Sequence, residues 1–179
     1  MKKILKWIGI IFVVMIVIGV LSGNKGGSTN KQGGSTAQSN TETAKVAGLN
    51  ETVQDGDLAF TVTSVEKVKT LGNQYSKKTA QGTFYVIAMK VENKGKKTAT
   101  FDSSMAKVKD AEGREFERSI DGQTAKSMSE GKTDMFLQQI QPSLSVSGDL
   151  VFDLPEGMKS PTILLKGSIF NKGVEVKLE

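Results

Sequence analysis

The residues whose spacing is suited to covalent chemistry are three Ser-x-x-Lys pairs. They are Ser64 with Lys67, Ser104 with Lys107, and Ser129 with Lys132. At this spacing a desolvated lysine can act as the base that activates a serine nucleophile. Three matches in a lysine-rich chain indicate chance, however, and no Lys-Thr-Gly accompanies them. The first pair also falls in an expected strand, where residues three apart point to opposite faces. We therefore predict no catalytic residue and no enzymatic activity.

Two shorter patterns are suited to ligand or metal binding. Residues 131–133 read Gly-Lys-Thr, as at the end of a phosphate-binding loop, but the position of the required earlier glycine is Lys126. Asp110 and Glu112 precede a glycine as in a calcium loop, yet no bidentate glutamate follows at the required distance, so a hairpin turn is expected. Histidine and cysteine are absent, which excludes disulfides, imidazole or thiolate metal sites and a Ser-His-Asp triad. The sequence predicts no metal ion and no cofactor.

The net charge of +5 comes from the N-terminal quarter of the 179-residue chain. Residues 1–45 hold six lysines and one glutamate, whereas residues 46–179 carry 18 basic and 18 acidic side chains. Nucleic-acid binding needs a basic excess on the folded part, because its affinity comes from cations that displace counterions from phosphates. We therefore expect no nucleic-acid partner.

Residues 1–21 have the pattern of an export signal or a membrane anchor. Lys2, Lys3 and Lys6 precede a run of 15 residues without a polar side chain, from Trp7 to Leu21. As a helix this run would span about 22 Å, which does not decide between a cleaved signal and a membrane-spanning anchor. Lysines on the N-terminal flank favour a cytoplasmic N-terminus and an extracellular remainder. The expected anchor residues are Trp7, Ile8, Ile10, Ile11, Phe12, Val13, Val14, Ile16, Val17, Ile18, Val20 and Leu21.

The end of this segment bears on how the chain is held at the membrane. Leu21-Ser22-Gly23 resembles the end of a bacterial lipoprotein signal, but Asn24 stands where the acylated cysteine would follow. No thioether-linked lipid can form there. Cleavage by an ordinary signal peptidase near Ser22 and Gly23 is the alternative to an uncleaved anchor, and the sequence leaves both open.

Residues 22–45 are expected to form a disordered linker. The segment consists almost wholly of Gly, Ser, Thr, Asn, Gln and Lys, and it has no large apolar side chain. It cannot bury enough apolar surface to offset the entropy lost on ordering. As a flexible coil it has a root-mean-square span of about 27 Å.

From residue 46 to residue 179 the apolar pattern has period 2, which predicts an all-β domain of antiparallel strands. Leu58, Phe60 and Val62 alternate with smaller or polar residues, and residues 84–91 are apolar on both faces, as in a central strand. Turn residues between the runs, such as Asn93 and Gly113, tolerate a positive φ. Seven to nine strands in this length favour a β-sandwich.

Two segments do not follow the strand pattern. Residues 119–135 are polar and are expected to form a loop with a short helical turn, and residues 71–82 are expected to form a second connection. Long loops of a sandwich often carry its binding function. These segments are therefore the first candidate binding surfaces, although the sequence identifies no ligand-binding residue in them.

Four blocks of the sequence, in this order, resemble a known family: residues 82–93, 108–116, 140–142 and 147–155. The family is the telokin-like, immunoglobulin-fold domain of unknown function found on lipoproteins and secreted proteins of Gram-positive bacteria and their phages. The resemblance implies an immunoglobulin-like, telokin-like antiparallel β-sandwich outside the membrane and carries no catalytic residue. The chain departs from the family pattern at Ser143, where Pro-Gly is usual, and at Asn24, where many relatives have the lipid-modified cysteine.

These observations lead to three functional hypotheses. The first is a non-catalytic binding or interaction module of the bacterial cell envelope, tethered to the cell membrane by its N-terminal helix and recognising another envelope protein through edge strands or loops. The second is a secreted structural or antigen-like protein whose signal peptide is removed. The third is an enzyme that uses only carboxylates and lysines, which would need a cleft with paired carboxylates of raised pKa.

Overall fold

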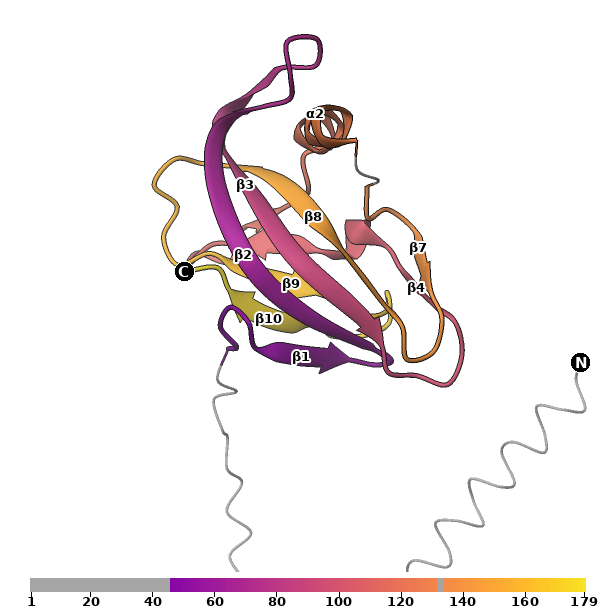
Figure 1. Ribbon diagram of the computed structural model, residues 1–179. Coiled ribbons are helices and arrows are strands. Elements are labelled where there is room, and N and C mark those ends of the chain that lie inside the picture. Colours follow the sequence, from indigo (N-terminus) through magenta and orange to yellow (C-terminus); the bar gives the residue numbers. More distant parts are fainter. Residues whose placement is uncertain (1–45, 132–133) are drawn as a thin grey trace, which may run out of the picture. The chain divides into compact units, whose positions relative to one another are not determined.

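The computed structural model describes residues 46–131 and 134–179, so the expected anchor and linker, residues 1–45, lie outside the described residues. The described part contains ten strands, one α-helix and one short 3-10 helix (Figure 1). In chain order they are β1 (Thr52–Asp55), β2 (Leu58–Leu71), β3 (Lys78–Asn93), β4 (Ala99–Phe101), η1 (Ser103–Met105), β5 (Lys107–Lys109), β6 (Glu115–Phe116), α2 (Ile120–Glu130), β7 (Gln138–Ile140), β8 (Ser145–Leu154), β9 (Thr162–Leu165) and β10 (Val174–Lys177).

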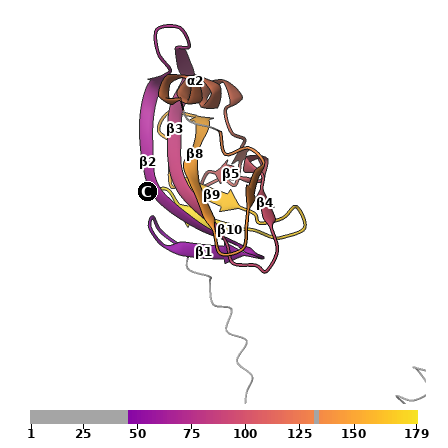
Figure 2. The ribbon, with the colours of Figure 1, turned by 45° about the vertical axis from the view of Figure 1, so that its right-hand side comes forward.

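The strands form two antiparallel sheets of four strands, in the orders β1-β2-β3-β8 and β10-β9-β5-β6, and a small sheet of β4 and β7. Strands β2 and β3 are the longest pair, and their pairing runs from Leu58 opposite Asn93 to Leu71 opposite Lys78. The two four-stranded sheets form the two layers of a β-sandwich (Figures 1 and 2). This confirms the antiparallel β architecture predicted from the period-2 pattern.

The main hydrophobic core draws side chains from both four-stranded sheets. Phe60, Ile87 and Phe152 of one sheet and Ile163 of the other are fully buried in this core. Phe101 of β4 packs edge-on against Phe60, with ring centroids 5.8 Å apart. Burial of apolar surface of this kind supplies most of the free energy of folding, and here it does so without a disulfide.

Strand β3 is apolar on both faces because helix α2 covers the face that points away from the main core. Phe84 and Val86 alternate with the core residues of β3 and form a second cluster with Ala80 and Val151. Figure 2 shows α2 lying across β3 and β8. The sequence correctly indicated a central strand, since β3 pairs with β2 on one side and β8 on the other.

Two expectations from the sequence need correction. Residues 119–135 were expected to be a loop with a short helical turn, but residues 120–130 form an 11-residue α-helix. The described residues also hold ten strands rather than seven to nine. The additional ones, among β4, β5, β6 and β7, have only two or three residues. Strands this short cannot show an alternating pattern.

The turn between β7 and β8 keeps a positive φ without the glycine that is usual in the family. Ser143 has φ 64°, and the N–H of Leu144 donates to the carbonyl of Gln141 at 3.1 Å. Pro142 occupies the preceding position, where its fixed φ suits the turn. Ser143 therefore adopts a left-handed conformation that glycine would adopt at a lower conformational cost.

Candidate functional site

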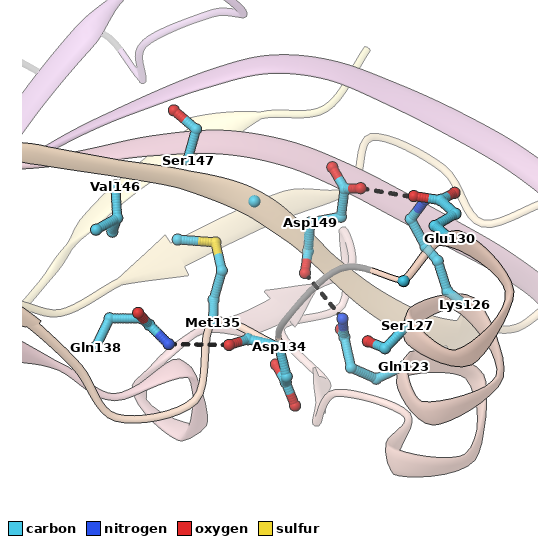
Figure 3. A pocket seen from close by; sticks show the side chains of 12 residues that line it. Gln123, Lys126, Ser127, Glu130, Asp134, Met135, Gln138, Val146, Ser147 and Asp149 are labelled. Atoms are coloured by element: carbon cyan, nitrogen blue, oxygen red, sulfur yellow. Dashed lines mark hydrogen bonds and ion pairs between the residues drawn. The ribbon is translucent and has the colours of Figure 1, made fainter.

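A cavity of about 500 Å³ lies between helix α2, residues 134–138 and the first half of strand β8 (Figure 3). Gln123, Lys126 and Glu130 of α2 form one wall. Asp134, Met135 and Gln138 form a second wall, and residues 146–149 of β8 form the floor.

Helix α2 begins and ends at residues suited to those positions. The Ser119 side chain caps the N-terminus by accepting a hydrogen bond from the N–H of Gly122 at 3.1 Å. Gly131 ends the helix with φ 65° and donates its N–H to the carbonyl of Ser127. Gly122 allows the helix to lie directly on the sheet, because a Cβ at this position would be 2.8 Å from side-chain carbons of Phe84 and Val151.

Gln123 connects the helix to the edge of β8. Its side-chain carbonyl accepts a hydrogen bond from the N–H of Val151 at 3.0 Å, and its amide donates to the carbonyl of Asp149 at 3.1 Å. The N–H of Ser119 donates to the carbonyl of Val151 at 2.7 Å. Gln123 and Ser119 therefore satisfy this half of the β8 edge much as a neighbouring strand would.

Lys126 is the buried cation of the cavity. Its ammonium group forms ion pairs with Glu130 and, at 3.1 Å, with Asp149 Oδ2. Burial alone would lower the pKa of Lys126, but the hydrogen bonds and charges of Glu130 and Asp149 outweigh it and raise that pKa. The amine is therefore held protonated and is unsuited to act as a general base or a nucleophile.

Asp134 brings further negative charge to the opposite wall. Arg118 donates to Asp134 Oδ2 at 2.8 Å, while Asp134 Oδ1 is buried without a hydrogen-bond partner among the described residues. Met135 packs into the space left by Gly148, where a Cβ would lie 2.5 Å from Met135 Cγ. Three carboxylates and one lysine line the cavity, so the lining is acidic.

The first half of β8 is a sheet edge beside this cavity. In an antiparallel strand every second residue directs its N–H and carbonyl to the same side. Val151 and Asp149 face α2, so Ser147 and Ser145 direct their main-chain groups to the same outer side. Within the described residues nothing pairs with those groups, and both serines are exposed. An unpaired edge of this kind can accept an additional strand.

The two Ser-x-x-Lys pairs that can be located are not arranged for catalysis. Lys67 lies 2.5 Å from Glu179 and 4.8 Å from the centre of the Tyr85 ring, and the hydrogen bond that it donates to Glu179 raises the pKa of Lys67. Lys107 binds Glu115 and Glu117, which raise its pKa in the same way. Both amines are thus held in the protonated form. The lysine of the third pair, at position 132, lies outside the described residues.

The other predicted positions take structural roles or cannot be located. The expected anchor residues and the cleavage positions Ser22 and Gly23 lie outside the described residues. Asp110 organises the β5–β6 hairpin, accepting hydrogen bonds from the N–H groups of Glu112 and Arg114. Residues 71–82 contain the tip of the β2–β3 hairpin. In residues 46–131 and 134–179 no helix is sufficiently long and apolar to cross a bilayer, and no three acidic side chains are grouped as metal ligands.

Sequence reasoning selected the segment 119–135 as a candidate surface but not the side chains that line the cavity. Gln123, Lys126 and Asp149 have no motif in common, and they meet only because α2 crosses the edge of β8. The sequence does contain one signal for the helix. Ser119 is a favourable N-cap residue and Gly131 is a favourable C-terminal residue, and they enclose the 11 residues of α2.

The sequence and the fold match known proteins. The model of the family described as a domain of unknown function, DUF4352, matches residues 47–176. The chain belongs to the DUF4352 family. This confirms the family resemblance found in the sequence. The uncharacterized protein YxkC of Bacillus subtilis is 32% identical to this chain over 147 residues, which are 79% of each chain.

Solved structures show the same fold at lower sequence identity. The yjhA protein of Bacillus subtilis superposes with a TM-score of 0.57 at 16% identity, over 75% of this chain and all of that one. MPT63, a secreted protein of Mycobacterium tuberculosis, gives a TM-score of 0.51 at 13% identity, over 75% of this chain and 98% of its own. The DUF4352 domain described here therefore has the fold of proteins that include a secreted one.

Proposed function

We propose that this protein is a non-catalytic binding domain, with an immunoglobulin-like (telokin-like) sandwich, on the outer side of the bacterial cell membrane. The location is supported by the cationic and apolar pattern of residues 1–21 and by the secreted protein among the structural neighbours. The anchor is the uncleaved N-terminal segment, and residues 22–45 are the flexible tether. Release by cleavage near Ser22 and Gly23 is the alternative.

The single observation that carries the binding role is the unpaired edge of β8 beside an acidic cavity. Ser145 and Ser147 offer main-chain donors and acceptors to an added strand, while Asp134 and Asp149 lie in the cavity next to that edge. An extended segment on this edge would place every second side chain toward the cavity. The ligand that fits is an extended segment of an envelope protein with a lysine or arginine at that position.

The electrostatics of the cavity favour binding over catalysis. The Lys126 ammonium is already neutralised by Glu130 and Asp149. A general acid or base would need a pKa moved toward neutrality, whereas the pKa of Lys126 moves away from it. A cationic side chain of a ligand would instead bind the carboxylates that line the cavity beside the open edge, Asp134 and Asp149.

A test uses two peptides of alternating residues, valine with lysine and valine with glutamate, titrated into the full-length protein. The lysine peptide should bind and the glutamate peptide should not. Ser147→Pro removes an outward N–H without breaking a bond to β3, so it should abolish binding while leaving the fold intact. Ser147→Ala is the matched control, because it changes the same side chain but keeps the main-chain N–H and should therefore bind like the native protein. Equal binding of both peptides, or of neither, would contradict the proposal.

The location is tested separately by cell fractionation and intact mass. A full-length chain in the membrane fraction, which external protease cuts within residues 22–45, is the expected result. A shortened chain in the medium would instead support the secreted alternative. Loss of Trp7, the only tryptophan, would identify that product.

A further inference from the structure

The loop between β9 and β10, residues 166–173, presents two large apolar side chains to solvent. Ile169 is 71% exposed and Phe170 is 89% exposed. They occupy the central positions of a turn in which the N–H of Asn171 donates to the carbonyl of Ser168 at 3.1 Å. These positions usually hold Gly, Asn, Asp or Pro, whereas here Ile169 borders a pocket with Met105 and Leu164 and Phe170 projects into solvent.

This loop is fixed to the body of the domain. The N–H of Gly167 donates to Asp55 Oδ2 at 2.7 Å, and a Cβ at Gly167 would lie 2.1 Å from the main-chain oxygen of Asp55. A Cβ at Gly56 would likewise lie 2.7 Å from Asn171 Nδ2. Close contacts at both ends of the turn therefore fix the position of the loop, with Ile169 and Phe170 projecting into solvent.

Three other connections lie at the same end of the sandwich as the loop 166–173. They are residues 55–57, 94–98 and 141–144, and we call the four segments together the loop end. The N–H of Lys94 donates to the carbonyl of Asp57, and the N–H of Asn93 donates to the carbonyl of Leu144. Leu144 is 58% exposed and adds a third apolar side chain. Figure 2 shows the β3–β4 and β9–β10 connections at the lower right of the domain.

The loop end has a basic excess, with five lysines against Asp55 and Asp57, and Lys94 is paired with Glu92 at 2.6 Å. Lys96, Lys97, Lys166 and Lys172 form no ion pair within 4 Å with any described residue, although Lys166 acts electrostatically on Glu115. Protruding apolar side chains at an end of the domain with a basic excess are the pattern of a surface that enters the headgroup region of an anionic bilayer. Ile169 borders a pocket with Met105 and Leu164, whereas Phe170 projects with 89% of its surface exposed, and a deformable lipid layer can surround such a protruding side chain.

We infer that the loop end docks on an anionic lipid bilayer, with Ile169 and Phe170 inserted among the headgroups and the four lysines bound to lipid phosphates. The inference rests on the proposed location at the outer membrane surface. The tether would keep the domain close to the bilayer, and docking would fix the orientation of the domain on it. The hairpin tip around Tyr75, at the far end of β2 and β3, would then point away from the membrane.

The test uses the full-length chain in nanodiscs that contain phosphatidylglycerol and a quencher-labelled lipid. The chain has no cysteine, so Ser168→Cys can carry a fluorescent probe at the loop end and Lys77→Cys can carry it at the hairpin tip. Lipid quenching is expected at position 168 and not at position 77. Added salt should reduce this quenching, because salt screens the attraction between lysines and phosphates.

Matched variants separate the loop end from the rest of the surface. Replacing Ile169 and Phe170 by alanine should lower the docked fraction about tenfold. Replacing the four lysines by glutamine should also lower it. Tyr75→Ala removes a side chain with the same 89% exposure at the far end and should change nothing.

The outcomes distinguish docking from tethering. A chain that co-elutes with the discs but shows no quenching at position 168 overturns the docking and leaves the membrane tether intact. A chain that does not co-elute with the discs overturns both. Equal loss of quenching in the Tyr75→Ala variant would also overturn the assignment to the loop end.

Discussion

The side-chain carbonyl of Gln123 accepts the hydrogen bond that the N–H of Val151 would otherwise offer to a neighbouring strand, at 3.0 Å. One glutamine on a helix thus closes the half of the β8 edge that lies under α2. The other half, at Ser145 and Ser147, has no such cover among the described residues. The border between the closed and the open half of the edge coincides with the acidic cavity.

Gln123→Met is expected to destabilise the domain by about 1–3 kcal/mol. The methionine has a similar volume, so the loss isolates the two hydrogen bonds to β8 and leaves buried main-chain groups unsatisfied. Urea unfolding followed by circular dichroism measures the change. Gln123→Glu keeps the acceptor for Val151 and loses the donor to Asp149. Its free energy of unfolding should lie between those of the native chain and Gln123→Met. A methionine variant as stable as the native chain would show that water replaces these bonds at no cost.

Gly122→Ala should destabilise the domain by about 1–3 kcal/mol although alanine favours helices. Its Cβ would lie 2.8 Å from buried carbons of Phe84 and Val151, so the helix must move off the sheet. Thr124→Ala, at an exposed position of the same helix, is the control and should be neutral or slightly stabilising. Thermal unfolding of both variants measures the difference. A more stable Gly122→Ala would mean that the contact between helix and sheet is loose.

Ser143→Gly is expected to stabilise the domain by about 0.5–1 kcal/mol. Serine at φ 64° is in the left-handed region, where a side chain costs free energy that glycine does not. The reverse change, Gly131→Ala at φ 65°, should destabilise the domain by about 1 kcal/mol, since a Cβ there would touch none of the described residues and only the backbone cost remains. Denaturation midpoints compare the two. If both variants changed in the same direction, backbone conformation would not be the cause.

Asp110 should make stability fall at acid pH. Burial alone would raise the pKa of this carboxyl, but the Arg114 side chain and the N–H groups of Arg114 and Glu112 outweigh it and lower the pKa. A lowered carboxyl pKa contributes stability that is complete above the ordinary pKa and is lost as pH falls through the folded value. The stability gap between the native chain and Asp110→Asn should therefore be constant near neutral pH and narrow in acid.

Arg114→Met provides the control for this pH dependence. It keeps the buried carboxylate but removes its cation, so it should raise the pKa of Asp110 and lower stability at neutral pH. Urea unfolding across a pH series measures both variants. A gap for Asp110→Asn that stays constant into acid would contradict the role of the ion pair.

The strands that position the site could be predicted because their side chains alternate. Phe84 and Val86 face the helix while Tyr85 and Ile87 face the main core, and this arrangement is visible as an apolar run in the sequence. The helix could not be predicted in the same way. Its contact with the sheet is made by Gly122 and Ala125, and such small residues give no apolar periodicity.

The cavity could not be predicted because its residues meet only in the folded chain. Lys126 and Asp149 are 23 positions apart in sequence, and their ion pair at 3.1 Å depends on the crossing of α2 over β8. The exposure of Phe170 was equally hidden, since an Ile-Phe pair in a sequence is more often part of a core. Turn geometry, set by Ser168 and Asn171, directs that side chain outward.

The bridge between Ala47 and Val176 joins the beginning and the end of the described domain, and the N–H of Lys177 donates to the carbonyl of Ala47 at 2.8 Å. Strand β10 completes one sheet and is the last strand of the described chain. If the chain crosses a membrane with its N-terminus first, the sheet that contains β10 would remain incomplete until residue 177 had left the membrane. Because the first and last segments of the described domain pair with each other, its folding would be completed only once β10 is free to pair.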